Sequence, residues 1–320
     1  MLCSTIIPTI NRPSLERTLR SALNQDLDTS QHEVIVVNDS GQPLPDAEWL
    51  RSKQLTVLNT NRCERSVACN AGAAAARGKY LKFLHDDDWL LPDALKALIE
   101  VAERSGSPWV YGAYSRVDDD GRLMSVQRPE VKGNAFAHSV AGDCFPLASS
   151  LIQREVFFEV GGFDPLRNTS EDIDLQWRVT RSGALDFTEQ MVANIRVGVT
   201  GVTSTDWAKM TADCRLVRER ALDAPGARRR MAASIGKNVT LRGRCCRACL
   251  ISALLNLKAG NLATSCRRLL PLVALALPGV LSPAFWRGLG MRSHWHANEK
   301  AKEETHLASH YPETFRPQSR

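Results

Sequence analysis

Three consecutive carboxylates, Asp86, Asp87 and Asp88, directly follow an apolar run and His85. Adjacent like charges raise one another's pKa and are costly unless a cation or a hydrogen-bond network compensates them. Mg²⁺ and Mn²⁺ prefer oxygen ligands and keep positions for substrate phosphates, so this cluster suits an ion bridged to a diphosphate. The alternative is a solvated acidic turn before Pro92, which fits the apolar flanks poorly.

Two further acidic positions are ambiguous on their own. Asp39 follows the β-branched run at residues 34–37 and could accept hydrogen bonds from a base or ribose, but an ordinary Asx turn with Ser40 explains it equally well. Asp172 stands where a helix is expected to begin, so backbone N–H groups and the helix dipole stabilise its charge. A pair of capping acids with Glu171 is the alternative there.

The elements that carry these residues alternate short apolar runs with helical patterns, which indicates βα units around a mostly parallel sheet. Polar residues that follow the strands lie where open α/β sheets bind ligands. Strands are expected at residues 3–7, 34–37, 55–58, 80–84, 109–114 and 147–153. Helices are expected from Pro13, at residues 65–77 with Gly78 closing, after Pro92, and from Glu171 through Val179. Residues 118–121 read as a hairpin-like turn.

These pieces, in this order, resemble the family 2 glycosyltransferases of the GT-A fold from Ser4 to about Val199. The resemblance implies an α/β GT-A fold for nucleotide sugars, with a central mostly parallel sheet flanked by helices and a C-terminal helical region. The motifs that carry it are Ile6 to Arg12, Val34 to Ser40, Arg65 with Asn70 to Gly72, Tyr80 to Asp88, Gly161 to Asp164, and Glu171 to Leu175.

The resemblance also implies a donor site. Asp39 would face the base, Arg65 the donor phosphates and Asp86 the ribose or sugar. Asp87 is the preferred ligand for Mn²⁺ or Mg²⁺, with Asp88 beside it. Residues assigned to the nucleotide sugar, preferably a UDP-sugar, are Pro8, Thr9, Asn11, Arg12, Asp39, Arg65, Asn70 and Asp86.

By the same resemblance, Asp172 is the general base of an inverting transfer to an acceptor hydroxyl, because inversion needs one base opposite one leaving group. Glu171 and Asp174 would support it. The implied acceptor is a glycan or a lipid-linked molecule in bacterial cell-surface polysaccharide, lipopolysaccharide or glycolipid assembly. A catalytically degenerate relative that only binds the nucleotide sugar is the alternative.

Two departures qualify the match. His85 occupies the first position of the usual Asp-x-Asp-Asp string, so the choice of metal ligand among Asp86, Asp87 and Asp88 stays open. Where relatives often have a histidine after the final strand, this chain has Arg196 followed by residues 197–201 without one. Metal affinity is therefore expected to be lower, or to be supplied differently.

Charge divides the chain near Trp207. Up to that residue there are 21 Lys and Arg against 28 Asp and Glu, and after it 20 against 7. We expect a catalytic domain at 1–207, with a nucleotide-binding half at 1–115 and an acceptor-binding half at 116–207. A basic, partly apolar helical region at 208–298 and a polar tail at 299–320 would follow.

The helical region allows two readings. Its arginine clusters and the apolar stretch at 269–281, broken by Pro271 and Pro278 and too short to span a bilayer, suit an interfacial element beside a lipid-linked acceptor. Helices packed on the catalytic domain with arginines outward are the alternative. We expect His294 and His296 to lie at the surface.

Nine scattered cysteines and no signal peptide before the first apolar run favour a reducing, cytoplasmic location, with peripheral contact on the inner face of the plasma membrane if the helical region is interfacial. The Cys246–Cys249 pair lacks the second pair that a zinc site needs. A nucleic-acid-binding protein would interleave aromatic residues with the basic ones, and residues 228–247 contain none, so no nucleic-acid partner is expected. Nucleotidyltransferases and dinucleotide-binding dehydrogenases need glycines after the first strand, and residues 8–13 have none.

Overall fold

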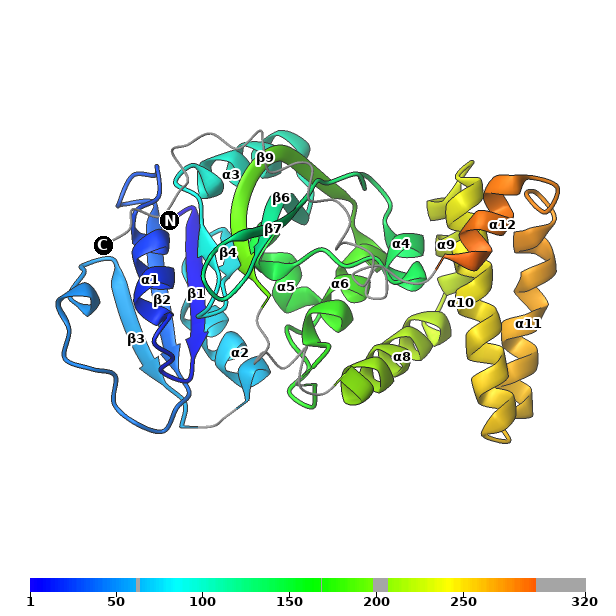
Figure 1. Ribbon diagram of the computed structural model, residues 1–320, viewed down its shortest axis with the longest axis horizontal. Helices are drawn as coiled ribbons and strands as arrows, with labels where there is room; N and C mark the ends of the chain where they lie inside the picture. Colours follow the sequence, from blue (N-terminus) through cyan, green and yellow to red (C-terminus); the bar gives the residue numbers. More distant parts are fainter. Residues whose placement is uncertain (62–63, 168, 198–206, 292–320) are drawn as a thin grey trace.

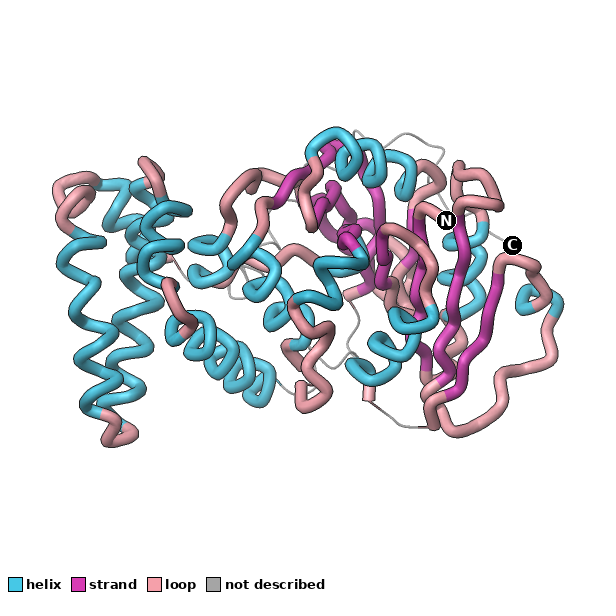
Figure 2. The backbone as a smooth tube through the Cα atoms, turned by 180° about the vertical axis from the view of Figure 1, so that it is seen from behind, coloured by secondary structure: helices cyan, strands magenta, loops and turns pink. Residues whose placement is uncertain are grey.

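The computed structural model describes residues 1–61, 64–167, 169–197 and 207–291. An α/β part holds the described strands, and a group of helices forms the opposite end of the molecule (Figures 1 and 2). The strands are β1 Cys3–Thr9, β2 His32–Asn38, β3 Leu55–Asn59, β4 Tyr80–Phe83, β5 Trp89–Leu90, β6 Trp109–Val117, β7 Leu123–Gln127, β8 Ser150–Gln153 and β9 Leu185–Arg196.

The helices form two groups, one in the α/β part and one at the helical end. Those of the α/β part are α1 Leu15–Leu23, α2 Arg65–Ala75, α3 Ala94–Ser105, α4 Phe136–Ala141, α5 Arg154–Glu159 and α6 Glu171–Ser182, with 3₁₀ turns η1 Glu48–Leu50 and η2 Leu147–Ser149. Those of the helical end are α8 Trp207–Asp223, α9 Ala227–Ile235, α10 Val239–Lys258, α11 Leu262–Ala276 and α12 Pro283–Gly290.

The sheet runs in the order β3-β2-β1-β4-β8-β6-β9-β5, and β7 pairs with β6. Strands β3, β2, β1 and β4 are parallel, as expected for successive βα units. Beyond β4 the sheet is mixed, because β8 pairs antiparallel with both β4 and β6 while β6 and β9 are parallel. The expectation of a mostly parallel sheet therefore describes the first half of the fold.

Each face of the sheet has its own core because successive side chains of a strand point to opposite faces. Ile7 of β1 packs with Leu19 of α1 and Leu98 of α3 on one face. Ile6 packs with α2, α5 and α6 on the other face. Continuous burial of β1 and β2 explains why both strands read as unbroken apolar runs.

Helix α2 lies very close to the sheet. A Cβ on Gly72 would meet Cγ2 of Ile6 at 2.5 Å, so only glycine fits there. The prediction that the helix extends to residue 77 and is terminated by Gly78 was wrong, because α2 ends at Ala75 with Ala76 as its C-cap. Gly78 instead packs against β1, where a Cβ would meet the backbone nitrogen of Ser4 at 2.6 Å.

The helical end packs onto the α/β part through a third core. Phe136 of α4 and Trp177 of α6 join buried residues of α8 to α12 there. Helix α11 runs through position 271 instead of ending at it. A proline leaves the carbonyl four residues earlier without its helical donor, and the guanidinium of Arg228 donates to that carbonyl of Arg267 at 2.7 Å.

The described residues contain neither a disulfide nor a helix that could span a membrane. The eight described cysteines are free thiols, and of these Cys266 on α11 is the exposed one. No described helix combines the length and apolar character needed to cross a bilayer. Histidines 294 and 296 and the tail at 299–320 lie outside the described residues.

Candidate active site

Parallel strands β1, β2 and β4 end at one edge of the sheet, and the predicted donor residues gather there. Thr9, at the end of β1, donates from Oγ1 to Oδ2 of Asp86 at 2.7 Å and accepts from the backbone nitrogen of Asn11 at 2.9 Å. Asn11 has φ +65°, a left-handed conformation that asparagine tolerates. Pro8 is buried one residue earlier in β1.

Asp39 is buried, and its carboxylate is held by the chain that leads into α2. It accepts from Oγ1 of Thr60 at 2.5 Å and from the backbone nitrogen of Glu64 at 2.6 Å. The Asx turn that the sequence allowed at Asp39 is formed by its neighbour, since Oδ1 of Asn38 accepts from both the backbone and the hydroxyl of Ser40. Asp39 is thus fixed at the strand edge with β1 and β4.

Arginines compensate much of the acidic cluster after β4. Nη1 of Arg12 lies 3.2 Å from Asp86 and 3.1 Å from Asp87, and Nη1 of Arg196 lies 3.5 Å from Asp87. Asp88 is buried, and its Oδ1 accepts from the backbone nitrogen of Arg196 at 2.9 Å. Burial raises the pKa of Asp88 well above its usual value and also raises that of Asp86.

His85 completes a group that could bind a metal ion. One ligand atom each from His85, Asp87 and Asp88 lies within 4.8 Å of the others. The His85 Nε2 atom is buried and has no hydrogen-bond partner among the described residues. Burial and the nearby Arg65 charge lower the His85 pKa to about 4, which keeps the ring in the neutral form that binds metals.

This donor set fits a divalent ion: an imidazole nitrogen with two carboxylates suits Mn²⁺ better than Mg²⁺, which prefers oxygen alone. Sequence reasoning did not name His85 as a ligand. The feature that could have identified His85 as a ligand is its position, because it occupies the first place of the Asp-x-Asp-Asp string, where relatives usually have aspartate.

Helix α2 is tied to the start of α6. Nε of Arg65 lies 2.6 Å from Oε1 of the buried Glu171. Asn70 exchanges two hydrogen bonds with the backbone of Phe163, at 2.8 and 2.9 Å. Arg65 and Asn70 thus bind the start of α6 and the segment before it. Their assignment to the nucleotide sugar stays a prediction.

Asp172 lies in the first turn of α6, partly buried. Its Oδ1 accepts from the backbone nitrogen of Ile173 at 2.8 Å, and Sγ of Cys144 is 3.9 Å from Oδ2. Burial, followed by the charge of Glu171, raises the Asp172 pKa to about 6. Asp174 points elsewhere and binds Trp177 at 3.2 Å and Arg178 at 2.7 Å.

The acids after β4 and the start of α6 form one electrostatically linked cluster. The charges of Asp87 and Glu171 raise the pKa of the His85 ring, and the charge of Arg65 lowers it. Arg65 in turn senses both Glu171 and Asp172. The ion pair of Arg65 with Glu171 thus connects α2 to the turn of α6 that carries Asp172, and both of its charges act on His85 of the metal-binding group.

Comparison with known proteins supports a glycosyltransferase. A Staphylococcus aureus poly(ribitol-phosphate) beta-N-acetylglucosaminyltransferase, TarP, is 33% identical over 159 residues, 47% of either chain. An uncharacterized glycosyltransferase of Haemophilus influenzae is 26% identical over 54% of this chain and 60% of its own length. One of Rickettsia bellii is 26% identical over 61% of this chain and 30% of its own length. The matched part of the chain thus spans between 30% and 60% of the length of these relatives.

Solved structures show the fold. S. aureus TarS 1–349 in complex with UDP-GlcNAc has a TM-score of 0.61 at 15% identity, covering 83% of this chain and 89% of that one. The GT-A expectation is confirmed, and the likeness covers more of the chain than residues 1–207. The model for "Glycosyl transferase family 2" matches residues 4–170, just over half of the 320 residues. The chain therefore belongs to glycosyltransferase family 2.

Proposed function

We propose that this protein is an inverting glycosyltransferase that moves a sugar from a nucleoside-diphosphate sugar to an acceptor hydroxyl. The observation that carries the proposal is the ion pair of Arg65 with Glu171 at 2.6 Å, because Asp172 follows Glu171 in the chain and the charges of both Arg65 and Glu171 act on His85 of the metal-binding group. A donor diphosphate and an incoming hydroxyl need such a pairing of a cation-binding group and a base within the reach of one sugar.

For the donor, we propose a UDP-sugar on the edge formed by β1, β2 and β4. The TarS complexes with UDP-GlcNAc and UDP support that choice for a protein of this fold. Thr9 and Asp39 are fixed at this edge by hydrogen bonds to the chain, so a nucleotide would meet side chains that are already ordered. Arg65 would lie near the donor phosphates.

For the metal, we propose that His85, Asp87 and Asp88 hold Mn²⁺ or Mg²⁺. A bound divalent ion supplies charge neutralisation for the leaving diphosphate. Asp87 would exchange its contacts with Arg12 and Arg196 for the ion, while the buried Asp88 stays anchored by the backbone of Arg196.

For the chemistry, Asp172 accepts the proton of the attacking hydroxyl. A pKa of about 6 lets the carboxylate stay ionised at neutral pH and makes it a stronger base than an ordinary aspartate. Glu171 supports this role by its charge and its ion pair with Arg65. Asp174 would contribute by holding Trp177 and Arg178 of the same helix in place.

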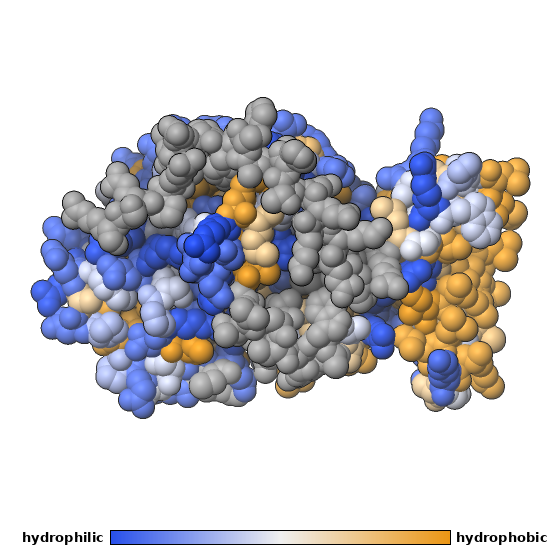
Figure 3. Space-filling model, viewed as in Figure 1, coloured by the Kyte–Doolittle hydropathy of each residue, from blue (hydrophilic) through white to orange (hydrophobic). Residues whose placement is uncertain are grey.

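The helical end suggests where the enzyme works. Figure 3 shows a broad apolar surface over α10, α11 and α12. Its exposed large side chains are Leu250, Leu254, Leu255, Leu257, Leu262, Leu269, Leu270, Val273, Leu277, Leu281 and Trp286. We propose that this apolar helical surface rests on the cytoplasmic face of a membrane, beside a glycan or lipid-linked acceptor of cell-surface polysaccharide, lipopolysaccharide or glycolipid assembly.

We retain the division into a catalytic domain at 1–207 and a helical region at 208–298 as part of the proposal. The third core supports packing of the helical region on the catalytic domain, and the apolar helical surface supports contact with lipid. Packing on the catalytic domain and contact with lipid are therefore compatible, because different faces of the same helices serve each, although Arg218, Arg244 and Arg247 line a cavity and do not all face outward.

A binding-only relative remains a second candidate because two arginines already pair with Asp87. The deciding experiment incubates the full chain with UDP-, dTDP- and GDP-sugars and Mn²⁺ and measures nucleotide release. Asp172→Asn is expected to reduce release at least 1,000-fold while UDP still raises the melting temperature, as it does in the wild type. Wild-type turnover in Asp172→Asn would remove this residue from the mechanism, and UDP binding without release in the wild type would favour the second candidate.

A further inference from the structure

A cavity lies where the helical end meets the α/β part, next to the first turn of α6. It has a volume of about 140 Å³ and is lined by α4, α6, α8 and α10. That is roughly ten times the space a single water needs, so a group of several heavy atoms fits. Ile173 and Cys214 both line it, and the thiol of Cys214 has a pKa raised to about 12 by burial and then by the charge of Asp172.

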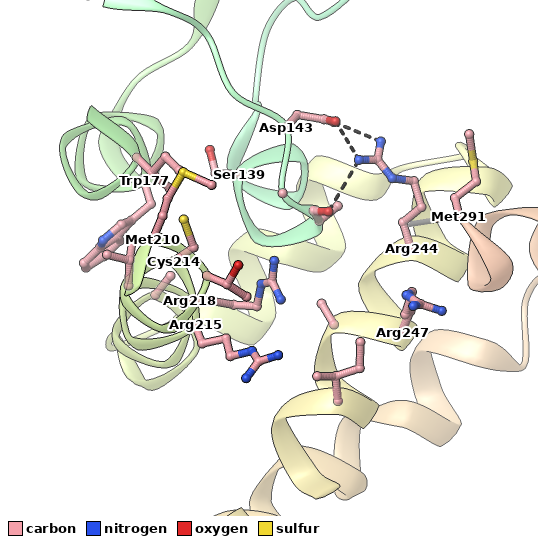
Figure 4. A pocket seen from close by; sticks show the side chains of 18 residues that line it. Ser139, Asp143, Trp177, Met210, Cys214, Arg215, Arg218, Arg244, Arg247 and Met291 are labelled. Carbon is pink, nitrogen blue, oxygen red and sulfur yellow. Dashed lines mark hydrogen bonds and ion pairs between the residues drawn. The ribbon is translucent and has the colours of Figure 1, made fainter. Parts of the chain in front are cut away.

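The lining of this cavity is strongly basic. It contains four arginines, Arg215, Arg218, Arg244 and Arg247, against one carboxylate, Asp143. Each pair of arginines is spaced three residues apart on its helix, so Arg215 and Arg218 share a face of α8 and the other two share a face of α10. Figure 4 shows Arg215 and Arg218 extending from α8 toward α10, while Arg244 turns to Asp143 and Arg247 lies on α10.

Only one of these arginines has its charge neutralised by a described partner. Arg244 binds both oxygens of Asp143, at 2.6 and 3.0 Å. Arg247 reaches one backbone carbonyl, that of Leu289, at 3.2 Å. The Nε of Arg218 is buried without a hydrogen-bond partner among the described residues, and Glu219, its neighbour on α8, is already paired with Arg268 at 3.1 Å.

A buried N–H group without a hydrogen-bond partner is costly, and burial lowers the pKa of Arg218. Phosphate oxygens fit the planar fork of an arginine, which binds them by charge-assisted hydrogen bonds. Part of the remaining wall is apolar, with Ile173, Trp177 and Ile251, so it can accommodate the carbon chain attached to a phosphate.

We propose that this cavity binds a phosphate group of the sugar acceptor, held by Arg215, Arg218 and Arg247. The proposal rests on the proposed function, because it gives the acceptor site of that enzyme its chemistry. Ile173 lines the cavity, so an acceptor held there by its phosphate would lie against the turn of α6 that also carries Asp172. The acceptor would then be a phosphate-linked sugar or polyol, either free in solution or attached to lipid.

The test uses the full chain saturated with UDP and Mn²⁺, so that the donor site is filled. sn-Glycerol 3-phosphate is titrated by calorimetry, and phosphatidylglycerol vesicles are added in a parallel sedimentation assay. Arg218→Gln and Arg247→Gln are each expected to weaken binding at least tenfold, whereas Arg229→Gln, an exposed arginine of α9 outside the cavity, leaves it unchanged. A loss confined to glycerol 3-phosphate indicates a soluble phosphate, and a loss confined to vesicles indicates a lipid phosphate.

Wild-type binding of both probes by Arg218→Gln and Arg247→Gln, or no binding of either probe by the wild type, would overturn the proposal. Should Arg218→Gln fail to fold, the exposed Arg215→Gln gives the same reading. If the chain binds no UDP, the proposed function fails by itself. The titration without UDP then still reports on the cavity, because Arg247 lies on α10 and not at the strand edge.

Discussion

Asp172 combines the features that a base requires with a cost to the fold. Its carboxylate is partly withdrawn from water at the start of α6 and stands next to another acid, Glu171, so its pKa rises to about 6 from 3.8. A pKa that is higher in the folded than in the unfolded chain means that the ionised side chain destabilises the fold above that pH. Function and stability therefore conflict at this position.

We predict that Asp172→Asn stabilises the protein at pH 8 by roughly 1 to 3 kcal/mol, since each unit of pKa shift corresponds to about 1.4 kcal/mol. The gain should shrink as the pH falls through about 6 and vanish below the unfolded value of 3.8. Denaturant unfolding at pH 8 and pH 4 measures it. The exposed Asp93→Asn, whose side chain makes no cap hydrogen bond, serves as the control, and equal gains at both pH values would contradict the prediction.

A second prediction concerns Arg196 and the affinity of the acidic cluster for Mn²⁺. Its guanidinium pairs with Asp87 at 3.5 Å and with Asp119 at 2.6 Å, so it competes with a cation for the cluster. Arg196→Gln should raise Mn²⁺ affinity three- to tenfold, because the like charge is removed while the backbone bond to Asp88 is kept. Calorimetric Mn²⁺ titration measures this, with the exposed Arg122→Gln as control.

An unchanged or weaker Mn²⁺ affinity in Arg196→Gln would mean that His85, Asp87 and Asp88 do not bind the ion as proposed. Sequence reasoning found the acids of this site because unpaired carboxylates after a buried strand need compensation. It did not identify the two arginines that neutralise Asp87. Arg12 and Arg196 are far apart in the sequence and meet Asp87 only in the folded chain.

At the scale of elements, packing of α2 on the sheet is limited by the size of one residue. A Cβ on Gly72 would lie 2.5 Å from Ile6 and 3.0 Å from Val37. Gly72→Ala should therefore destabilise the fold by about 1 to 3 kcal/mol despite the better helix propensity of alanine. A lower denaturation midpoint checks this, against Gly290→Ala, where a Cβ meets nothing within 4 Å. Equal stability of Gly72→Ala and the wild type would show that β1 gives way.

Strands and helices of the first half could be predicted because each is a continuous apolar or periodic segment. Helix α11 could not, because proline at 271 suggested a break. The deciding contact, from Arg228 to the carbonyl of Arg267, joins residues 39 positions apart. The antiparallel insertion of β8 between β4 and β6 was likewise hidden, since pairing partners are not encoded in the apolar pattern of a strand.

For the whole molecule, the apolar helical surface lies at the opposite end from the edge strand β3 (Figure 1). We predict that phosphatidylglycerol vesicles sediment the wild-type chain, and that replacing Leu270, Val273 and Leu277 together with glutamine weakens this at least tenfold. The control replaces Val57, Met124 and Leu166, which are also exposed but lie in the α/β part. Equal loss in both triple variants would point to nonspecific adhesion.

The exposed thiol of Cys266 on α11 offers a labelling site from which contact of the apolar helical surface with lipid can be measured. Cys266 precedes Leu270, Val273 and Leu277 by four, seven and eleven residues, so it lies on the same stripe of the helix. The other described thiols are less accessible, and those of Cys3, Cys214 and Cys249 have pKa values raised to about 12 by burial. Under mild conditions a polarity-sensitive maleimide dye should thus attach at Cys266 ahead of these thiols, and its emission would shift to the blue as the stripe enters lipid.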